Sequence, residues 1–298
     1  MNNILLNLRG KLDPQMLRLL RGAADVAAQQ SIEFFVVGAS ARDLILEHGY
    51  GLPSRRATMD VDLAIAISDW LSYERFFTAM ANAGIVNPIK GIAHKYQVRG
   101  SSLTVDIVPF GAIEHPVGTI AWPPEFETRM TVTGFRDAHA CALRVALDDA
   151  LVIGVASLHG LAFLKLLAWR ERSFETQRDG IDLDFIIRQY GTPVMQARLL
   201  GEAFEVLEHE NFDTLAAGAR LLGIDMGCAM STPTRNAVCA TLDHEMTDAS
   251  GLRLAQLLAG GQTDDAAIDA AIAQIKRIRD GTDEAAAGGA WASDSWRY

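Results

Sequence analysis

The sequence predicts an α+β protein in two parts, a region of mixed strands and helices followed by an all-helical region. Up to about residue 155, short β-branched runs alternate with stretches of helical periodicity, and from Ser157 onward the pattern is helical. The 298 residues, 49% of them apolar, are sufficient for two hydrophobic cores. We therefore expect a first domain at 1–155, a helical domain at 156–280 and a flexible tail at 281–298.

Periodicity and turn residues define the elements of the first region. Ser68 is a helix-opening residue, and Gly100-Ser101-Ser102 predicts the turn of a hairpin. A tight connection is expected at Asp148-Asp149. On these grounds we expect, in order, a helix at 14–30, a strand at 32–37, a helix at 39–48, a strand at 59–67, a helix at 69–83, hairpin strands at 92–99 and 102–109, and strands at 130–135, 142–147 and 150–154.

Glycine and proline divide the helical region into segments. Its last helix is expected over 263–279, because Thr263 and two aspartates begin it and basic residues end it, which matches the helix dipole at both ends. The expected breaks between the earlier helices fall at Gly191, Pro193, Gly223 and Pro233.

Two carboxylates interrupt the apolar strand at 59–67. Asp60 and Asp62 are two residues apart, so they project on one face of the strand while its large apolar residues project on the other. Like charges held side by side are costly unless a cation lies between them, and a hard divalent cation prefers such oxygen ligands. The alternative is a pair of solvated surface aspartates, which the apolar surroundings disfavour. The pattern indicates a metal-dependent enzyme.

A third carboxylate repeats this geometry on another strand. In the run from Leu103 to Val108, Asp106 projects away from the face that carries Leu103, Val105 and Ile107. If this strand pairs with the first, Asp106 completes a cage of three carboxylates with Asp60 and Asp62.

A small-residue turn precedes the helix at 39–48. The apolar strand at 32–37 leads directly into Gly38-Ala39-Ser40. A strand, a turn of small residues and a helix N-terminus together favour an anion, because backbone N–H groups and the helix dipole point toward it. We therefore expect Gly38 and Ser40 to bind phosphate.

In this order, these motifs resemble the nucleotidyltransferase superfamily related to DNA polymerase beta. The run from Arg56 to Leu63 is similar to the R-x-[ST]-x-D-[IV]-D-L block of the AbiEii-type nucleotidyltransferases, the toxin half of type IV toxin–antitoxin systems. Lys165, followed by the run from Arg178 to Leu183, resembles that family's helical lysine and its [KR]-D-x-x-D-[IL] motif. The two blocks lie in the family's order and cover about residues 32–190.

The resemblance implies a fold, a reaction and a set of site residues. The fold is a small mixed sheet flanked by helices, followed by an all-α domain. The reaction moves a nucleoside monophosphate from a nucleoside triphosphate to an acceptor hydroxyl, with two Mg²⁺ ions as cofactor. The acceptor is the 3′ end of a transfer RNA or a protein hydroxyl, and a cognate antitoxin is a possible further partner. The implied residues are Asp60, Asp62 and Asp106 for the metals, Gly38, Ser40, Arg56, Lys165, Asp179 and Asp182 for the nucleotide, with Lys165 also catalytic.

Lys165 also stands out without the family. The helix from Leu158 to Trp169 is apolar nearly all round, and Lys165 is its only formal charge. Its ammonium either reaches solvent, pairs with Asp179 or Asp182, or meets the triphosphate of a nucleotide. The two aspartates lie three apart on one helical face, where they orient Lys165, act on the nucleophile or complement the helix dipole.

Composition narrows the class of protein further. Cys141, Cys228 and Cys239 are too widely spaced for a zinc site and too few for a disulfide framework, and no signal peptide or apolar membrane span is evident. We therefore expect a cytoplasmic protein without membrane contact. The net charge of −10 argues against an extended nucleic-acid surface. A few basic residues, including Lys95, are nevertheless available to line one cleft.

Two other functions remain open at this point. One is nucleotidyl transfer to a small molecule such as an antibiotic, for which the modest basic content is suited. The other is a non-catalytic nucleotide-binding module of the same fold, which the three intact carboxylates disfavour.

Overall fold

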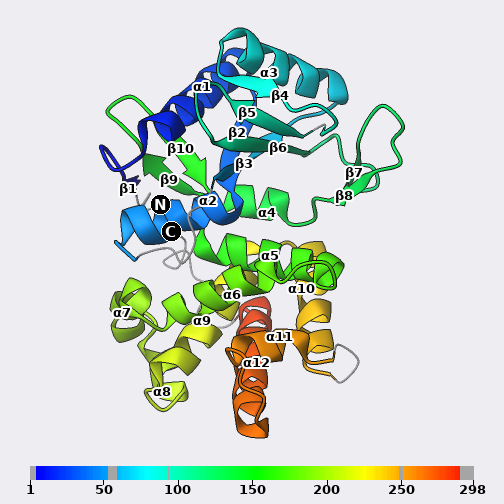
Figure 1. Ribbon diagram of the computed structural model, residues 1–298. Helices are drawn as coiled ribbons and strands as arrows, with labels where there is room; N and C mark the ends of the chain where they lie inside the picture. The colour runs from blue at the N-terminus through cyan, green and yellow to red at the C-terminus, as the bar shows by residue number, and fades with distance from the viewer. Residues whose placement is uncertain (1–4, 53–58, 93, 248–250, 289–298) are drawn as a thin grey trace. The chain divides into compact units, whose positions relative to one another are not determined.

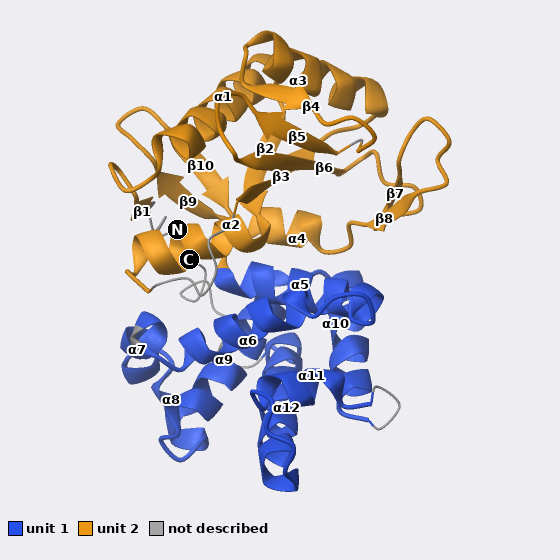
Figure 2. Cartoon of the chain, viewed as in Figure 1, with its two compact units in different colours: residues 1, 158–297 blue, residues 2–157, 298 orange. Residues whose placement is uncertain are grey.

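The computed structural model describes residues 5–52, 59–92, 94–247 and 251–288 (Figure 1). The chain divides into two compact units, with the boundary between Ser157 and Leu158 (Figure 2). The expected α+β architecture is confirmed, because the first unit is built on a mixed sheet and the second consists of helices. Within the described residues, we find no helix with the length and hydrophobicity of a membrane span.

Among the described residues, eight strands form one sheet in the order β1-β9-β10-β2-β3-β6-β5-β4. The central strand β3 runs antiparallel to β2 and parallel to β6, and β5 runs antiparallel to β6. A separate hairpin pairs β7 with β8. The strands are β1 (Leu5–Asn7), β2 (Glu33–Val37), β3 (Asp60–Ala66), β4 (Val86–Pro88), β5 (Lys95–Val98), β6 (Thr104–Phe110), β7 (Thr119–Ala121), β8 (Arg129–Thr131), β9 (Leu143–Ala146) and β10 (Val152–Val155).

One face of the sheet is apolar and carries helices α1 (Pro14–Gln30) and α3 (Trp70–Asn82), which contact each other. On α3, the hydroxyl of Tyr73 donates to the carbonyl of Ile107 at 3.1 Å and lies 3.0 Å from the hydroxyl of Tyr96. Tyr96 pairs with Val105 in the sheet, so this face also presents the buried odd-numbered residues of β3 and β6. The even-numbered residues therefore lie on the other face.

Helix α4 (Phe135–Ala140) packs on that other face. Phe35 and Phe110 meet edge to face at 5.7 Å, and Phe110 lies 6.1 Å from Phe135. We predicted a strand over 130–135, and this prediction is only partly right. The strand β8 ends at Thr131, and Gly134, in the left-handed conformation at φ 86°, begins α4. Helix α4 thus covers this face near Phe110, at the end of β6, and not near the first residues of β3 and β6.

The predicted helix over 39–48 has an unexpected form. It consists of α2 (Gly38–Asp43) and a π-helical turn (Leu44–Gly49) that continues it. The strands β1, β4 and β7 were not expected, because each has only three residues and carries no measurable alternation.

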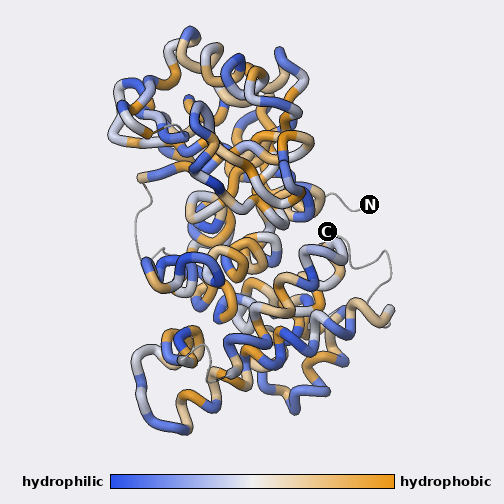
Figure 3. The backbone as a smooth tube through the Cα atoms, turned by 90° about the vertical axis from the view of Figure 1, so that its right-hand side faces the viewer, coloured by the Kyte–Doolittle hydropathy of each residue, from blue (hydrophilic) through white to orange (hydrophobic). Residues whose placement is uncertain are grey.

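The second unit contains α5 to α12. Hydrophobic and hydrophilic residues alternate along its helices (Figure 3). Helices α9 and α12 make its most extensive contact. The helices are α5 (Leu158–Arg172), α6 (Arg178–Tyr190), α7 (Pro193–Leu200), α8 (Phe204–His209), α9 (Thr214–Ala229), α10 (Thr232–Glu245), α11 (Arg253–Leu258) and α12 (Asp265–Ala286).

The prediction of a helix break at Gly223 is wrong. Gly223 lies inside α9, and a Cβ at this position would lie 2.1 Å from the carbonyl oxygen of Ile278 on α12. The glycine is therefore required by the close approach of two helices rather than by a turn. Gly281 has the same role on α12, where a Cβ would lie 2.2 Å from the carbonyl oxygen of Arg220.

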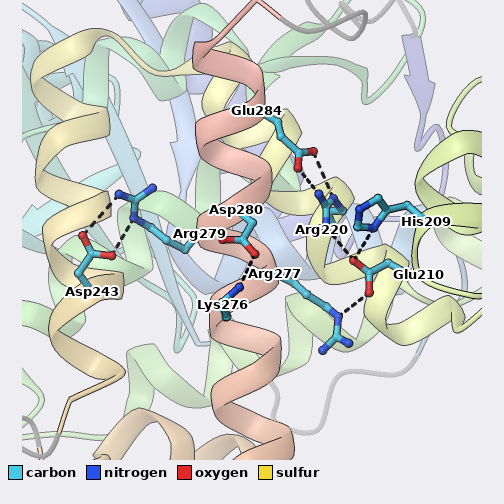
Figure 4. Close-up of polar contacts among 9 residues, drawn as sticks. All are labelled: His209, Glu210, Arg220, Asp243, Lys276, Arg277, Arg279, Asp280 and Glu284. Carbon is cyan, nitrogen blue, oxygen red and sulfur yellow. Dashed lines mark hydrogen bonds and ion pairs between the residues drawn. The ribbon is translucent and has the colours of Figure 1, made fainter.

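Ion pairs connect α12 to neighbouring helices of the second unit (Figure 4). The carboxylate of Glu210, at the end of α8, accepts hydrogen bonds from Arg220 at 2.9 Å and from Arg277 at 2.7 Å. Burial raises the pKa of Glu210, but the two guanidinium groups outweigh this effect and hold the pKa below its ordinary value. Arg279 pairs with Asp243 of α10 at 2.8 Å. These contacts join α8, α9, α10 and α12.

Helix α12 extends into the segment expected as a tail. Helix α12 continues through Ala286, and Gly281 and Thr282 are buried against α9, so residues 281–286 are part of the packed unit. The prediction of a flexible segment at these positions is wrong. Residues 289–298 lie outside the described part of the chain.

The close approach of α9 and α12 can be tested by the sign of the stability change when Gly223 is replaced by alanine. In an open helix, replacing glycine by alanine stabilises by about 1 kcal/mol. We expect Gly223→Ala instead to destabilise by about 1–3 kcal/mol, because the added methyl group meets the backbone of Ile278. Denaturant melts measure the change, and a stabilised variant would contradict the packing.

Candidate active site

Asp60, Asp62 and Asp106 share one face of the sheet at the start of two neighbouring strands. The parallel register of β3 and β6 places Asp62 directly opposite Asp106 and Asp60 opposite Thr104. The strand pairing that the sequence analysis set as a condition for grouping the three carboxylates is present. Since residues two apart on a strand share a face, all three carboxylates project away from the helices α1 and α3.

Lys95 lies between two of these carboxylates. Strand β5 places it opposite Asp106 in the sheet. Its Nζ lies 3.1 Å from Oδ1 of Asp60 and 3.6 Å from Oδ2 of Asp106. The hydroxyl of Thr104 also donates to Oδ1 of Asp60. From the sequence we expected Lys95 only as one of several basic residues near a cleft, because its place opposite Asp106 depends on the pairing of β5 with β6.

The charges on this face influence one another. Burial raises the pKa of the Asp106 carboxyl above its ordinary value, and the positive charges of Lys95 and His94 only partly offset this effect. Burial lowers the pKa of Lys95, but the hydrogen bond to Asp60 and the negative charges of Asp106 and Asp60 outweigh it, so the pKa is raised. Lys95 is therefore a cation at neutral pH.

The residue types suit magnesium, but the carboxylates are not gathered around a metal position. Carboxylate oxygens are preferred Mg²⁺ ligands, and Oδ1 of Asp106 is buried with no hydrogen-bond donor among the described residues. However, no group of three or more His, Cys, Asp or Glu side chains in the described part of the chain is placed to hold a metal ion. Lys95 instead contacts Asp60 and Asp106 and supplies one positive charge to the pair. The role of the three carboxylates as metal ligands stays a prediction.

The turn at Gly38 fits closely against the carboxylate strand. Gly38 has a φ of +67°, and a Cβ on it would lie 2.0 Å from Oδ2 of Asp62. The buried hydroxyl of Ser40 donates to the carbonyl of Val37 at 3.1 Å and accepts from the backbone N–H of Asp62 at 3.3 Å. Gly38 and Ser40 therefore fix the turn to β3. Their contact with phosphate stays a prediction, and Arg56 lies outside the described residues.

Lys165, in the helical unit, pairs with two carboxylates of α6. Its Nζ lies 3.0 Å from Oδ1 of Asp179 and 2.8 Å from Oδ2 of Asp182. Arg172 donates to both oxygens of Asp179, at 2.6 and 2.9 Å. Of the environments considered for Lys165, the structure shows the paired one. Both Asp179 and Asp182 therefore contact its ammonium, and their role in orienting Lys165 toward a nucleotide stays a prediction.

The pairing sets the charge states in this cluster. Burial raises the pKa of Asp179, which is 1% exposed, but the hydrogen bond from Arg172 and the charge of Lys165 outweigh this effect and lower the pKa. For Lys165, burial lowers the pKa, and the charges of Asp182 and Asp179 raise it above its ordinary value. Lys165 and Asp179 are therefore both charged at neutral pH.

The contact between Gly38 and Asp62 is tested by comparing two glycines with similar backbone angles. Gly100 has a φ of +72°, and a Cβ on it would have no described atom within 4 Å. Both Gly38→Ala and Gly100→Ala should lose about 1–2 kcal/mol through left-handed strain. We expect Gly38→Ala to lose roughly a further 1–3 kcal/mol, because its methyl group displaces the Asp62 carboxylate. Equal losses in denaturant melts would contradict the close fit.

The Lys165 cluster predicts a pH-dependent loss of stability. Lys165→Met should destabilise by about 1–3 kcal/mol at neutral pH, because it removes a donor from buried Asp179. The folded-state pKa of Asp179 is lowered, so its stabilising contribution is present above its unfolded-state pKa and is lost as pH falls through the folded-state value. The penalty of Lys165→Met should therefore shrink below about pH 4.

Lys276→Met is the matched control for this prediction, because Lys276 pairs with Asp280 at an exposed position. Such a pair contributes about 0–1 kcal/mol, so the control should stay close to the parent protein at every pH. Denaturant melts at a series of pH values measure both variants. Equal behaviour of the two would show that the buried pairing adds no stability.

Comparison with known proteins gives no family assignment. No protein-family model and no curated protein matches the chain. The solution structure of the antibiotic-resistance factor ANT(2'')-Ia is similar at 12% identity and a TM-score of 0.36, covering 67% of this chain and 98% of that chain. An antigenic nucleotidyltransferase-like protein from Paracoccidioides brasiliensis has 14% identity and a TM-score of 0.37, and the match covers 67% of this chain and 92% of that chain. A CCA-adding enzyme in complex with ATP has 17% identity and a TM-score of 0.25, and the match covers 93% of this chain and 72% of that chain. At such scores the similarity carries no functional argument, and the function is inferred from the site residues.

Proposed function

We propose that this chain is a magnesium-dependent nucleotidyltransferase that moves a nucleoside monophosphate from a nucleoside triphosphate to an acceptor hydroxyl. The observation that carries the proposal is the in-register pair of Asp62 and Asp106 on adjacent parallel strands, with Asp60 on the same face. Carboxylates are rarely placed together on a partly buried surface unless a cation is bound there. The fixed turn at Gly38 adjoins Asp62 and offers a place for the phosphates.

In this proposal, each site residue has a separate task. Asp60, Asp62 and Asp106 would hold two Mg²⁺ ions, which when bound would neutralise phosphate charge and acidify the acceptor hydroxyl. Asp106 would hold the ion nearer the acceptor. The backbone at Gly38 and Ser40, assisted by Arg56, holds the β- and γ-phosphates.

The proposed transfer is an in-line displacement. The acceptor hydroxyl loses its proton to water and its oxygen forms a bond to the α-phosphorus, while the bond from that phosphorus to the bridging oxygen breaks and pyrophosphate leaves with the electron pair. We assign to Lys165 the role of offsetting negative charge on the departing pyrophosphate, with Asp179 and Asp182 orienting its ammonium. Calorimetric titration of nucleotide into Lys165→Met tests this assignment, and unchanged affinity would exclude Lys165 from the nucleotide site.

The proposed acceptor is the 3′ end of a transfer RNA or a protein hydroxyl, as in a toxin-like enzyme with a cognate antitoxin. This part rests on the AbiEii-type motifs at Arg56–Leu63 and Arg178–Leu183. Incubation with each of four labelled nucleotides, Mg²⁺ and either total RNA, total protein or a panel of antibiotics identifies the acceptor. Label in an antibiotic supports the small-molecule alternative, and nucleotide binding without transfer supports the non-catalytic one.

The carboxylates give a direct test of the proposed activity. Asp62→Asn and Asp106→Asn should each lower nucleotidyl transfer by roughly 10³-fold or more, because each removes a charged ligand of the catalytic ions. Their folds should persist, since asparagine has nearly the same shape as aspartate. Labelled-nucleotide assays and thermal melts measure the two effects.

Asp149→Asn is the matched control, because the Asp149 side chain is 98% exposed. It makes the same chemical change away from the carboxylate face and should keep both activity and melting temperature. Near-normal transfer in Asp62→Asn or Asp106→Asn would remove these residues from the active site.

A further inference from the structure

Lys95 has the position of a cation shared by two carboxylates. Its ammonium contacts Oδ1 of Asp60 and Oδ2 of Asp106, which project from different strands. A divalent ion that bridges these two residues needs the same space between them. A dication and an ammonium within a few ångströms of each other repel strongly, so both cannot occupy it.

We propose that Lys95 is the resident counter-ion of the carboxylate site, and that a divalent ion bridging Asp60 and Asp106 displaces it. Lys95 then sets the metal concentration at which the site fills, and its movement accompanies metal binding. The inference rests on the proposed function, because it takes Asp60 and Asp106 as metal ligands.

The side chain of Lys95 is suited to leave and return. It is 25% exposed and has a flexible four-carbon stem, so its Nζ can move toward solvent without a change in the backbone of β5. The contacts that it makes, at 3.1 and 3.6 Å, are those of a partly exposed ion pair, which stabilises only modestly. By contrast, Mg²⁺ binds carboxylate oxygens directly, at about 2.0–2.1 Å.

The carboxylates also gain from exchanging one cation for the other. Lys95 leaves Oδ1 of Asp106 buried without a hydrogen-bond donor among the described residues. Lys95 also brings one positive charge to two negative side chains on different strands. A dication brings a second positive charge to the same place and can accept a further oxygen ligand.

Metal binding by three forms of the full chain tests this inference without any nucleotide. Mn²⁺ replaces Mg²⁺ as the probe, and electron paramagnetic resonance reports the free ion during titration. Lys95→Met should bind Mn²⁺ roughly tenfold more tightly than the parent chain, because no resident cation has to leave. Lys90→Met removes the same charge from an exposed position that forms no ion pair with any described residue, and it should bind within about twofold of the parent.

A second measurement uses the parent chain alone and does not depend on the folding of a variant. Acylation of lysine amines, followed by mass spectrometry of peptides, reports the reactivity of Lys95. Saturating Mg²⁺ should increase labelling of Lys95 severalfold, because its ammonium is released from the two carboxylates, while labelling of Lys90 should stay constant.

The outcomes separate this inference from the proposed function. Unchanged or weaker Mn²⁺ binding by Lys95→Met, with normal binding by the parent chain, overturns the role of Lys95 and leaves the metal-dependent function intact. Labelling of Lys95 that is unaffected by saturating Mg²⁺ also overturns it. Absence of Mn²⁺ binding in all three forms overturns both proposals.

Discussion

Repulsion among acidic side chains on one face of a β-sheet is the constraint on which the candidate site depends. The β-strand repeat forces Asp60 and Asp62 to the same side, and the parallel register adds Asp106 beside them. Groups close to the carboxylates reduce this repulsion. Lys95 supplies positive charge from the adjacent strand, and Gly38 leaves the space that the Asp62 carboxylate occupies. The apolar core on the opposite face keeps the strands paired in spite of the charges.

The helical unit handles buried charge in a different way. On the sheet, one partly exposed lysine is shared between two carboxylates. In the helical unit Lys165 is likewise shared between Asp179 and Asp182, but its side chain is more buried and Arg172 adds further hydrogen bonds to buried Asp179. A buried charge that accepts several hydrogen bonds is costly to separate from its donors, whereas a partly exposed pair stabilises only modestly. The contacts of Asp179 are therefore held more firmly than those of Lys95.

The sequence was informative where a local pattern determines the structure. Alternation alone placed Asp60 and Asp62 on one face, Asp106 joined them on the condition that the two strands pair, and the β5–β6 hairpin followed from its turn residues. Two features depended instead on contacts between distant segments. Gly223 has the same local signature as a helix breaker, and only the approach of Ile278 reveals its role in packing. Lys95 likewise has no distinguishing motif, because its importance comes from its position opposite Asp106 on the neighbouring strand.

The register of the strands determines at once which residues lie on the apolar face of the sheet and which lie on the acidic face. If β6 slipped by a single residue against β3, Asp106 would exchange faces with its apolar neighbours and would meet the packed aromatic layer formed by Tyr73 and Tyr96. Such a slip would bury an unpaired charge and expose Val105 and Ile107, so misaligned forms of the sheet are strongly disfavoured. The hydrophobic core under α3 thus enforces the alignment of the acidic residues, although none of its side chains lies on their face.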